Sequence, residues 1–215
     1  MKRGLFLFAS VFLLLLASCD KSSNEVGECR VHGTLPDDKY NGKCIYMIAL
    51  DKSIRDSIGV DSCYVENCKF EFVTRKHMMA IIRMDFHFRM GLEDLLVVEE
   101  PGDIYVTIDS ISSARGTENN DKLQQWKDIT EIRNEKYHSL IMLYHAASDS
   151  GDSITANSIK HKADSIHVDY KNVTRNMAKE LPDGPLKDFL GEMFPLTHKK
   201  RMPDGTIVEV SADEY

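Results

Sequence analysis

Residues 95–126 read LLVVEEPGDIYVTIDSISSARGTENNDKLQQW, and the periodicity of the chain changes within this stretch. Up to Asp109, apolar residues form two short runs on either side of Pro101-Gly102, a dipeptide that favours a tight turn because proline fixes φ and glycine tolerates positive φ. After Gly116, apolar residues recur three or four positions apart, as on one side of a helix. The stretch therefore predicts that a β region ends and an α region begins near residue 116.

The β region extends back from this boundary and is expected to fill residues 28–115. The third and fourth of its candidate strands flank Glu66-Asn67, which predicts a hairpin. Short strands with close connections are typical of an antiparallel sheet or a sandwich. Seven candidates lie between Cys29 and Ser110: CRVHGTL, KCIYMIAL, VDSCYV, KFEFVT, HMMAIIRMDFHF, LLVVEE and DIYVTID.

Residues 117–196 are expected to form an antiparallel helical hairpin and a short third helix. The first helix is predicted over 118–147 and ends at SDSGDS (148–153), where Asp152 or Ser153 can cap the second helix. LPDGP (181–185) ends the second helix, and LKDFLGEMF (186–194) predicts the third. The second helix carries apolar residues at alternating steps of three and four, which predict a coiled-coil-like seam against the first: Ala156, Ile159, Ala163, Ile166, Tyr170, Val173 and Met177. The predicted fold class is therefore α+β, an antiparallel β-sheet or sandwich domain followed by a helical hairpin.

The start of the chain has the order of a secretory signal peptide. Lys2 and Arg3 are basic, and the segment from Leu5 to Ala17 carries no charge but is shorter than the roughly 20 apolar residues of a membrane-spanning helix. Residues 1–18 are thus expected to be cleaved. Residues 19–27 are polar and suit a tether.

The four residues that span this cleavage point, LASC (16–19), resemble the lipobox of bacterial lipoproteins. The resemblance implies that Cys19 is acylated and becomes the first residue of the mature chain. Two or three acyl chains, at about 0.8 kcal/mol per buried methylene, give a stable membrane attachment. The alternative is an ordinary signal peptide in which Cys19 has no role.

The charge and the motif content limit the function classes. Lys and Arg number 27 against 34 Asp and Glu, a net charge of −7; removing residues 1–18 would leave 25 against 34, or −9. An acidic chain is a poor match for the phosphates of nucleic acid, so no nucleic-acid partner is expected. The sequence contains no phosphate loop, zinc spacing or nucleophile elbow, so we expect no cofactor, no metal and no catalytic residue.

Four cysteines follow Cys19, namely Cys29, Cys44, Cys63 and Cys68, and three pairings of them are open. Cys63 and Cys68 are the candidate disulfide. A four-residue loop would set them opposite each other, whereas a two-residue turn at Glu66-Asn67 would set them diagonally. Their Cys-x4-Cys spacing differs from the redox Cys-x-x-Cys, which favours structural thiols or a structural bridge over redox activity.

HMMAIIRMDFHFRM (77–90) is rich in methionine and histidine, which are ligands for copper. Strand alternation gives a simpler explanation, since it places on one face, as a sheet core requires, Met78, Ala80, Ile82, Met84, Phe86 and Phe88. The core interpretation is preferred.

The order of these features resembles a group of Bacteroidota lipoproteins that carry a β domain of unknown function, a helical segment and a thioredoxin-like thiol-disulfide interchange domain. The resemblance rests on VHGTLPDDKYNGKCIYMIALD, IGVDSCYVENCKFEF, VVEEPGDIYVTID and GTENNDKLQQW, and covers about residues 26–196. The family has Asn-Gly where this chain has Asn67-Cys68. Residues 197–215 resemble the hairpin that leads into the thioredoxin domain, and the domain with its Cys-x-x-Cys is expected to be missing.

Together these observations predict a lipid-anchored cell-envelope protein that acts as a non-catalytic binding or interaction module rather than an enzyme. Its expected partners are the membrane, through Cys19, and an envelope protein. Its expected location is the periplasmic face or the cell surface of the outer membrane. The alternative is a thiol-redox accessory protein that uses Cys63 and Cys68 beside a thioredoxin-like partner.

Overall fold

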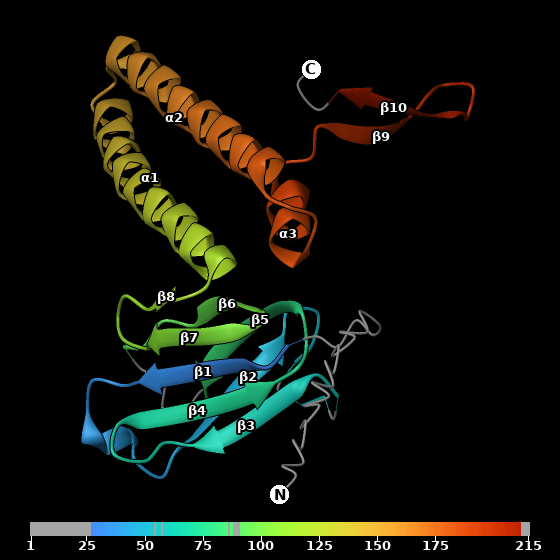
Figure 1. The fold of residues 1–215 in the computed structure, drawn as a ribbon. Helices are drawn as coiled ribbons and strands as arrows, with labels where there is room; N and C mark the ends of the chain where they lie inside the picture. Colours follow the sequence, from blue (N-terminus) through green and yellow to red (C-terminus); the bar gives the residue numbers. More distant parts are fainter. Residues whose placement is uncertain (1–26, 54, 57, 86, 88–90, 212–215) are drawn as a thin grey trace, which may run out of the picture.

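Strands of the β region form two sheets that pack face to face, and helices follow them (Figure 1). The structure is a computed structural model that describes residues 27–53, 55–56, 58–85, 87 and 91–211. The expected signal peptide, Cys19 and most of the tether lie outside the described residues. The predicted α+β class, a β-sandwich followed by a helical hairpin, is confirmed.

Within the described residues, each sheet contains four strands. One sheet has the order β4-β1-β7-β8 and the other β3-β2-β5-β6. Neighbouring strands pair antiparallel except β1 and β7, which run parallel. The strands are β1 (Cys29–Thr34), β2 (Cys44–Ala49), β3 (Val60–Tyr64), β4 (Lys69–Thr74), β5 (Met78–Met84), β6 (Leu95–Glu99), β7 (Gly102–Thr107) and β8 (Ser113–Arg115), with a 3-10 turn at Asp38–Tyr40.

Alternation along the strands produces the core between the sheets. On β4, Phe70 and Phe72 point inward and are buried, while Lys69 and Glu71 are exposed. The inward residues of the other strands meet them in one apolar cluster that includes Val31, Ile45, Ile82 and other aliphatic side chains. Burying each such side chain contributes roughly 1.5–3 kcal/mol, so this cluster is what holds the two sheets together.

The predicted hairpin of the third and fourth strands is wrong, because β3 and β4 belong to different sheets. A two-residue turn centred on Asn67 and Cys68 connects them, and Glu66 and Lys69 exchange two backbone hydrogen bonds of 2.8 and 3.0 Å. Asn67 and Cys68 have φ of 52° and 59°. Two successive positive φ values match a type I′ turn, which strongly favours glycine at its second central position.

Replacing Cys68 with glycine is therefore expected to stabilise the protein by about 1 kcal/mol, because a side chain with a Cβ costs 1–2 kcal/mol in this conformation. Urea unfolding would measure the change. Cys44→Gly, at a strand position in the extended conformation, is the control and should destabilise. A Cys68→Gly protein less stable than the parent would contradict this account of the turn.

The helices follow the predicted pattern closely. They are α1 (Glu118–Asp149), α2 (Ser153–Glu180) and α3 (Pro185–Met193). Asp152 caps α2, accepting a hydrogen bond of 3.0 Å from the backbone N–H of Thr155. α1 and α2 pack as an antiparallel hairpin that rises from the sandwich, and α3 lies between the base of α2 and the sheet (Figure 1).

A second apolar cluster fixes the helices onto the outer face of β5 and β6. Met79 and Val98 from the sheet contact Leu123, Trp126 and Leu186 from the helices. Across the hairpin, the Trp126 indole N–H donates to the Thr174 hydroxyl at 3.2 Å. The base of the helical hairpin is thus packed against the sandwich.

The predicted seam of α2 is confirmed at most of its positions. Ala156, Ile159, Ala163 and Tyr170 are buried and Ile166 and Met177 are half-buried, whereas Val173 is exposed. Towards the base of α2, burial moves to Thr174, Arg175 and Ala178. The shift arises because this end of the helix contacts α3 as well as α1, so the buried side turns away from a two-helix seam.

Asn120 and Gln124 join α1 to the edges of both sheets. Asn120 accepts a hydrogen bond from the Val98 N–H at 3.0 Å and donates to the Val98 carbonyl oxygen at 2.9 Å and to the Thr117 hydroxyl at 2.8 Å. Gln124 accepts from the Ala114 N–H of β8 at 3.0 Å. Both amide side chains are buried. They satisfy backbone groups that the edge strands β6 and β8 would otherwise bury without partners.

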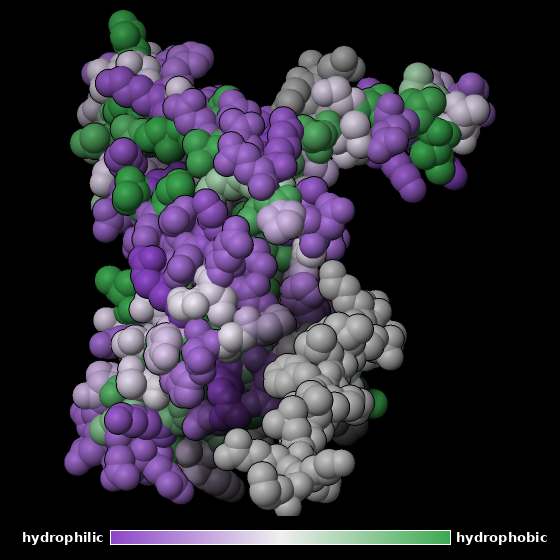
Figure 2. All heavy atoms as spheres, viewed as in Figure 1, coloured by the Kyte–Doolittle hydropathy of each residue, from purple (hydrophilic) through white to green (hydrophobic). Residues whose placement is uncertain are grey.

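Within residues 197–215, which resemble a lead-in hairpin, β9 (Thr197–Arg201) and β10 (Ile207–Ser211) form a two-stranded antiparallel hairpin. The hairpin projects from the base of α2, and apolar side chains reach the surface on it and on the helical hairpin (Figure 2). They include Leu196, Ile207, Met142 and Leu143. Among the described residues, no helix has the length and apolar content needed to span a membrane.

Candidate functional site

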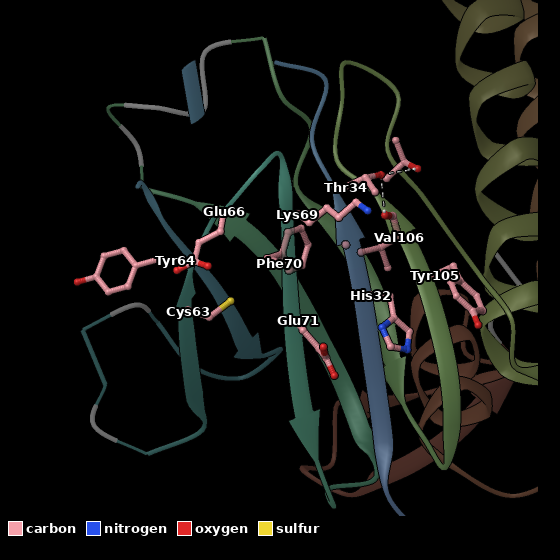
Figure 3. Close-up of a pocket in the computed structure, with 12 residues that line it drawn as sticks. His32, Thr34, Cys63, Tyr64, Glu66, Lys69, Phe70, Glu71, Tyr105 and Val106 are labelled. Atoms are coloured by element: carbon pink, nitrogen blue, oxygen red, sulfur yellow. Dashed lines mark hydrogen bonds between the residues drawn. The ribbon is translucent and has the colours of Figure 1, made fainter. Parts of the chain in front are cut away.

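A hollow of about 740 Å³ lies on the outer face of the sandwich, where β3, β4, β1 and β7 run side by side (Figure 3). Outward-facing positions of these strands line it. They are His32 and Thr34 on β1, Lys69 and Glu71 on β4, and Tyr105 and Thr107 on β7. On β3, Cys63 points toward β4 and packs against the core, whereas Tyr64 stands at the margin of the hollow and points away from it (Figure 3). We call this surface the outer hollow.

His32 is held in one orientation within the outer hollow. Its Nε2 lies 2.8 Å from Oδ1 of Asp103, and its ring stacks on Tyr105 with centroids 5.3 Å apart and planes at 25°. The parallel pairing of β1 with β7 places Tyr105 directly beside His32. One edge of the imidazole is thus occupied by a carboxylate and one face by a phenol ring.

The backbone at Gly33 explains why the strands can approach here. A Cβ on Gly33 would lie 1.9 Å from the ring of Phe70, which fills that place on the inner side of the sheet. Gly33 and Phe70 are paired residues of β1 and β4. Any larger residue at position 33 would clash with the Phe70 ring and require this side chain to move.

Hydroxyl groups and exposed aromatic rings dominate the accessible surface. The Thr34 hydroxyl donates to the Val106 carbonyl oxygen at 3.3 Å and lies 3.4 Å from the Thr107 hydroxyl (Figure 3). Tyr64 is 67% exposed and Tyr105 is 60% exposed. Tyrosine offers a large rigid contact area together with one polar atom, a combination that suits binding.

The cysteines in this region lack the features of a redox centre. Burial raises the pKa of the Cys63 thiol to about 11, despite a backbone hydrogen bond from Glu71 that lowers it. A redox-active cysteine needs a lowered pKa, so the shift has the wrong sign. Cys68 lies in the turn that follows β3, one residue later than the predicted turn centre, and is therefore neither opposite nor diagonal to Cys63. Cys63 and Cys68 are free thiols in the structure, and their disulfide stays a prediction.

The methionine- and histidine-rich stretch is part of the sheet core, as its alternation indicates. Ala80, Ile82 and Met84 of β5 are buried between the sheets, whereas Met78, which was expected beside them, is half-buried, and Met79 on the opposite face is buried against the helices. Phe86 and Phe88, which were expected on the same face, lie outside the described residues. Within residues 27–211 as far as the structure describes them, no group of three or more His, Cys, Asp or Glu side chains could hold a metal ion.

With this geometry in view, the comparisons with known proteins identify one domain. Residues 29–123 match the family described as a domain of unknown function (DUF4369). The matched segment contains the whole sandwich and ends in the first turns of α1, just after Asn120. No curated protein and no solved structure matches the chain.

The match confirms the coarser part of the predicted resemblance, a β domain of unknown function. The link to Bacteroidota lipoproteins and the missing thioredoxin domain remain predictions. Two of the resemblance motifs have structural reasons in this fold: the glycine of VHGTL makes room for Phe70, and the second asparagine of GTENN is Asn120.

Sequence reasoning missed the residues of the outer hollow. His32 and Tyr105 are 73 positions apart, and only the pairing of β1 with β7 brings them together. The sequence offers only a weak indication of this site. His32 and Tyr105 occupy outward-facing positions in VHGT and IYVT, two strand segments in which apolar residues alternate with others. Alternation identifies which residues face outward, but it does not tell which strands are neighbours.

Glu99 is a buried carboxyl outside the outer hollow. It is 1% exposed, and within the described residues its Oε2 has no hydrogen-bond partner. Burial raises the pKa of Glu99 above its ordinary 4.5, while Thr74 and Lys76 lower it and Asp61 raises it further. The folded protein thus holds this proton more tightly than the unfolded chain does.

Glu99 should therefore contribute its full stabilisation below pH 4.5 and lose it as the pH rises through the raised pKa. Glu99→Gln keeps the shape and removes the titration. We expect the variant to be more stable than the parent by about 1 kcal/mol at pH 7, and the gain to vanish towards pH 4. Urea unfolding across this pH range would measure it. A gain that is equal at both pH values would contradict the assigned pKa direction.

Proposed function

We propose that this chain is a lipid-anchored cell-envelope protein and a non-catalytic binding module, in which the outer hollow contacts an envelope protein partner. The observation that carries the proposal is the exposed Tyr105, which stacks on His32 on an open sheet face lined by polar groups, with a second exposed tyrosine, Tyr64, at the margin of the hollow. Tyrosine is enriched in protein interfaces, and its truncation there often removes much of the binding energy.

The N-terminal sequence supports the location. A basic start, an apolar run and small residues before Cys19 are together the pattern of a lipid-modified secreted protein. The acyl chains would hold the sandwich near a bilayer, on the periplasmic face or at the cell surface of the outer membrane. The short polar tether would leave the outer hollow accessible.

The chemistry of the hollow favours binding over catalysis. Nucleophilic catalysis needs an activated nucleophile within hydrogen-bond reach of a base. Cys63 has a raised pKa, and β4 lies between it and His32 (Figure 3). The imidazole of His32 instead pairs with Asp103 and stacks on Tyr105, contacts that orient a binding surface.

Photo-crosslinking in cells that express the full chain tests the proposal. A photoreactive phenylalanine derivative at position 105 should give a discrete crosslinked species of higher mass, and position 64 should give the same species. Position 168 is the control, because Val168 is an exposed residue of α2 away from the outer hollow. No adduct at 64 or 105, or an identical adduct at 168, would contradict the outer hollow as the contact surface.

A further inference from the structure

A second hollow, of about 440 Å³, is lined by residues within 93–96, 111–112 and 124–135. These segments lie near the place where α1 leaves the sandwich beside β8. Its walls are the loop before β8 and the first turns of α1, and β6 contributes Leu96. The volume falls within the 300–1,000 Å³ range of ligand-binding clefts. We call it the acidic groove. It shares no lining residue with the outer hollow.

Each wall of the acidic groove presents an exposed isoleucine. Ile111 in the loop is 75% exposed and Ile132 on α1 is 52% exposed. Half-buried Leu96 and buried Trp126 lie between them. Apolar side chains gathered in a hollow offer more contact area than scattered ones and are typical of an interaction site.

Carboxylates surround this apolar centre. They are Glu93 and Asp94 on one side and Asp128, Glu131 and Glu135 on α1. Asp94 pairs with Arg83 at 2.6 Å, and Asp128 pairs with Arg115 at 3.6 Å and accepts from Gln124 at 2.7 Å. In the described part of the chain, Glu131 and Glu135 have no ion-pair partner, although they are one helical turn apart and repel each other.

Lys127 is the single cation that lines the acidic groove among the described residues, and it does not neutralise the rim. Its ammonium donates to the Ser112 carbonyl oxygen at 2.9 Å. Burial lowers its pKa, while Glu93 and Asp128 raise it. Its ammonium is thus engaged by the loop backbone and lies near Glu93 and Asp128, so that Glu131 and Glu135 are the carboxylates of the groove without a compensating cation in the described part of the chain.

We propose that the acidic groove binds a basic segment of a partner protein, in which Lys or Arg residues flank an aliphatic side chain. The aliphatic side chain would contact Ile111, Ile132 and Leu96, and the cations would face Glu131 and Glu135. Charge complementarity selects this occupant, because it guides association and rejects partners of like charge. A second copy of this chain is a poor fit, since the chain is itself acidic. The inference goes beyond the proposed function and does not depend on the outer hollow.

Titration of the purified full chain with a fluorescent Lys-Leu-Lys-Lys-Leu-Lys peptide tests the proposal. Binding should be saturable and weaken with salt, and the matching Glu-Leu-Glu-Glu-Leu-Glu peptide should not bind. Glu131→Lys combined with Glu135→Lys should weaken binding by about tenfold, which corresponds to about 1.4 kcal/mol. The control pair, Asp149→Lys with Asp169→Lys, changes the net charge equally at exposed helix positions outside the groove, and should change affinity less than about twofold.

The apolar contribution is tested separately. Ile111→Ser should weaken binding of the basic peptide by about fivefold, whereas Ile154→Ser, at an α2 residue that is 83% exposed, should have no effect. Absence of binding, or equal effects of the two charge-reversal pairs, would overturn the proposal. So would self-association of the unmodified chain that the Glu131→Lys and Glu135→Lys pair abolishes, since that result would assign the groove to a second copy.

Discussion

Replacing Cys19 with alanine is expected to move the protein from the membrane fraction to the soluble fraction without changing its stability. The acyl chains that the lipobox resemblance implies would supply the whole attachment, and losing two or three chains removes many times the roughly 0.8 kcal/mol contributed by each buried methylene. β1 begins at Cys29, so position 19 precedes the first strand of the core. Fractionation followed by immunoblotting would measure the distribution.

Cys68→Ala is the matched control for this experiment. It removes another cysteine, from the turn between β3 and β4, and should leave the protein in the membrane fraction. A Cys19→Ala protein that remains wholly with the membranes would show that the anchor assignment is wrong.

Asn120→Ala is expected to destabilise the protein by about 3–5 kcal/mol, enough to unfold a large fraction of it. The substitution leaves the N–H and carbonyl groups of Val98 buried without partners, at about 1–3 kcal/mol each, and removes the bond to Thr117. Urea unfolding followed by tryptophan fluorescence would measure the loss, because Trp126 lies in the adjoining cluster.

Asn134→Ala makes the same substitution at an exposed position of α1 and should change the free energy of unfolding by less than about 0.5 kcal/mol. If both alanine variants unfold at the same urea concentration, Asn120 does not join α1 to the sheet edge in the way described.

The helical half of the fold could be predicted from the sequence almost completely. Its signals are local: Asp152 caps α2, LPDGP ends it, and the periodicity of apolar residues marks the seam as far as Tyr170. The seam prediction was wrong at Val173, because the contact with α3 changes which side of α2 is buried near its base. Spacing within one helix carries no information about a third helix that packs on it.

For the β half, the sequence predicts a sheet or sandwich of short strands, but it does not predict which strands pair with one another. Alternation identified the seven longer strands of the sandwich, and missed β8, which has only three residues. It did not show that β3 and β4 separate into different sheets, or that β1 pairs parallel with β7. These pairings bring together the residues that line the outer hollow. Its residues are therefore visible only in the folded chain, whereas Asn120 belongs to a motif that the resemblance had already marked.

Mass spectrometry of the N-terminal peptide from the membrane-purified protein tests the central claim most directly. The account predicts a mature chain that begins at Cys19 and carries two or three acyl chains. A chain that retains residues 1–18, or one that begins near Cys19 without acyl groups, would contradict the assignment of this protein as a lipid-anchored binding module.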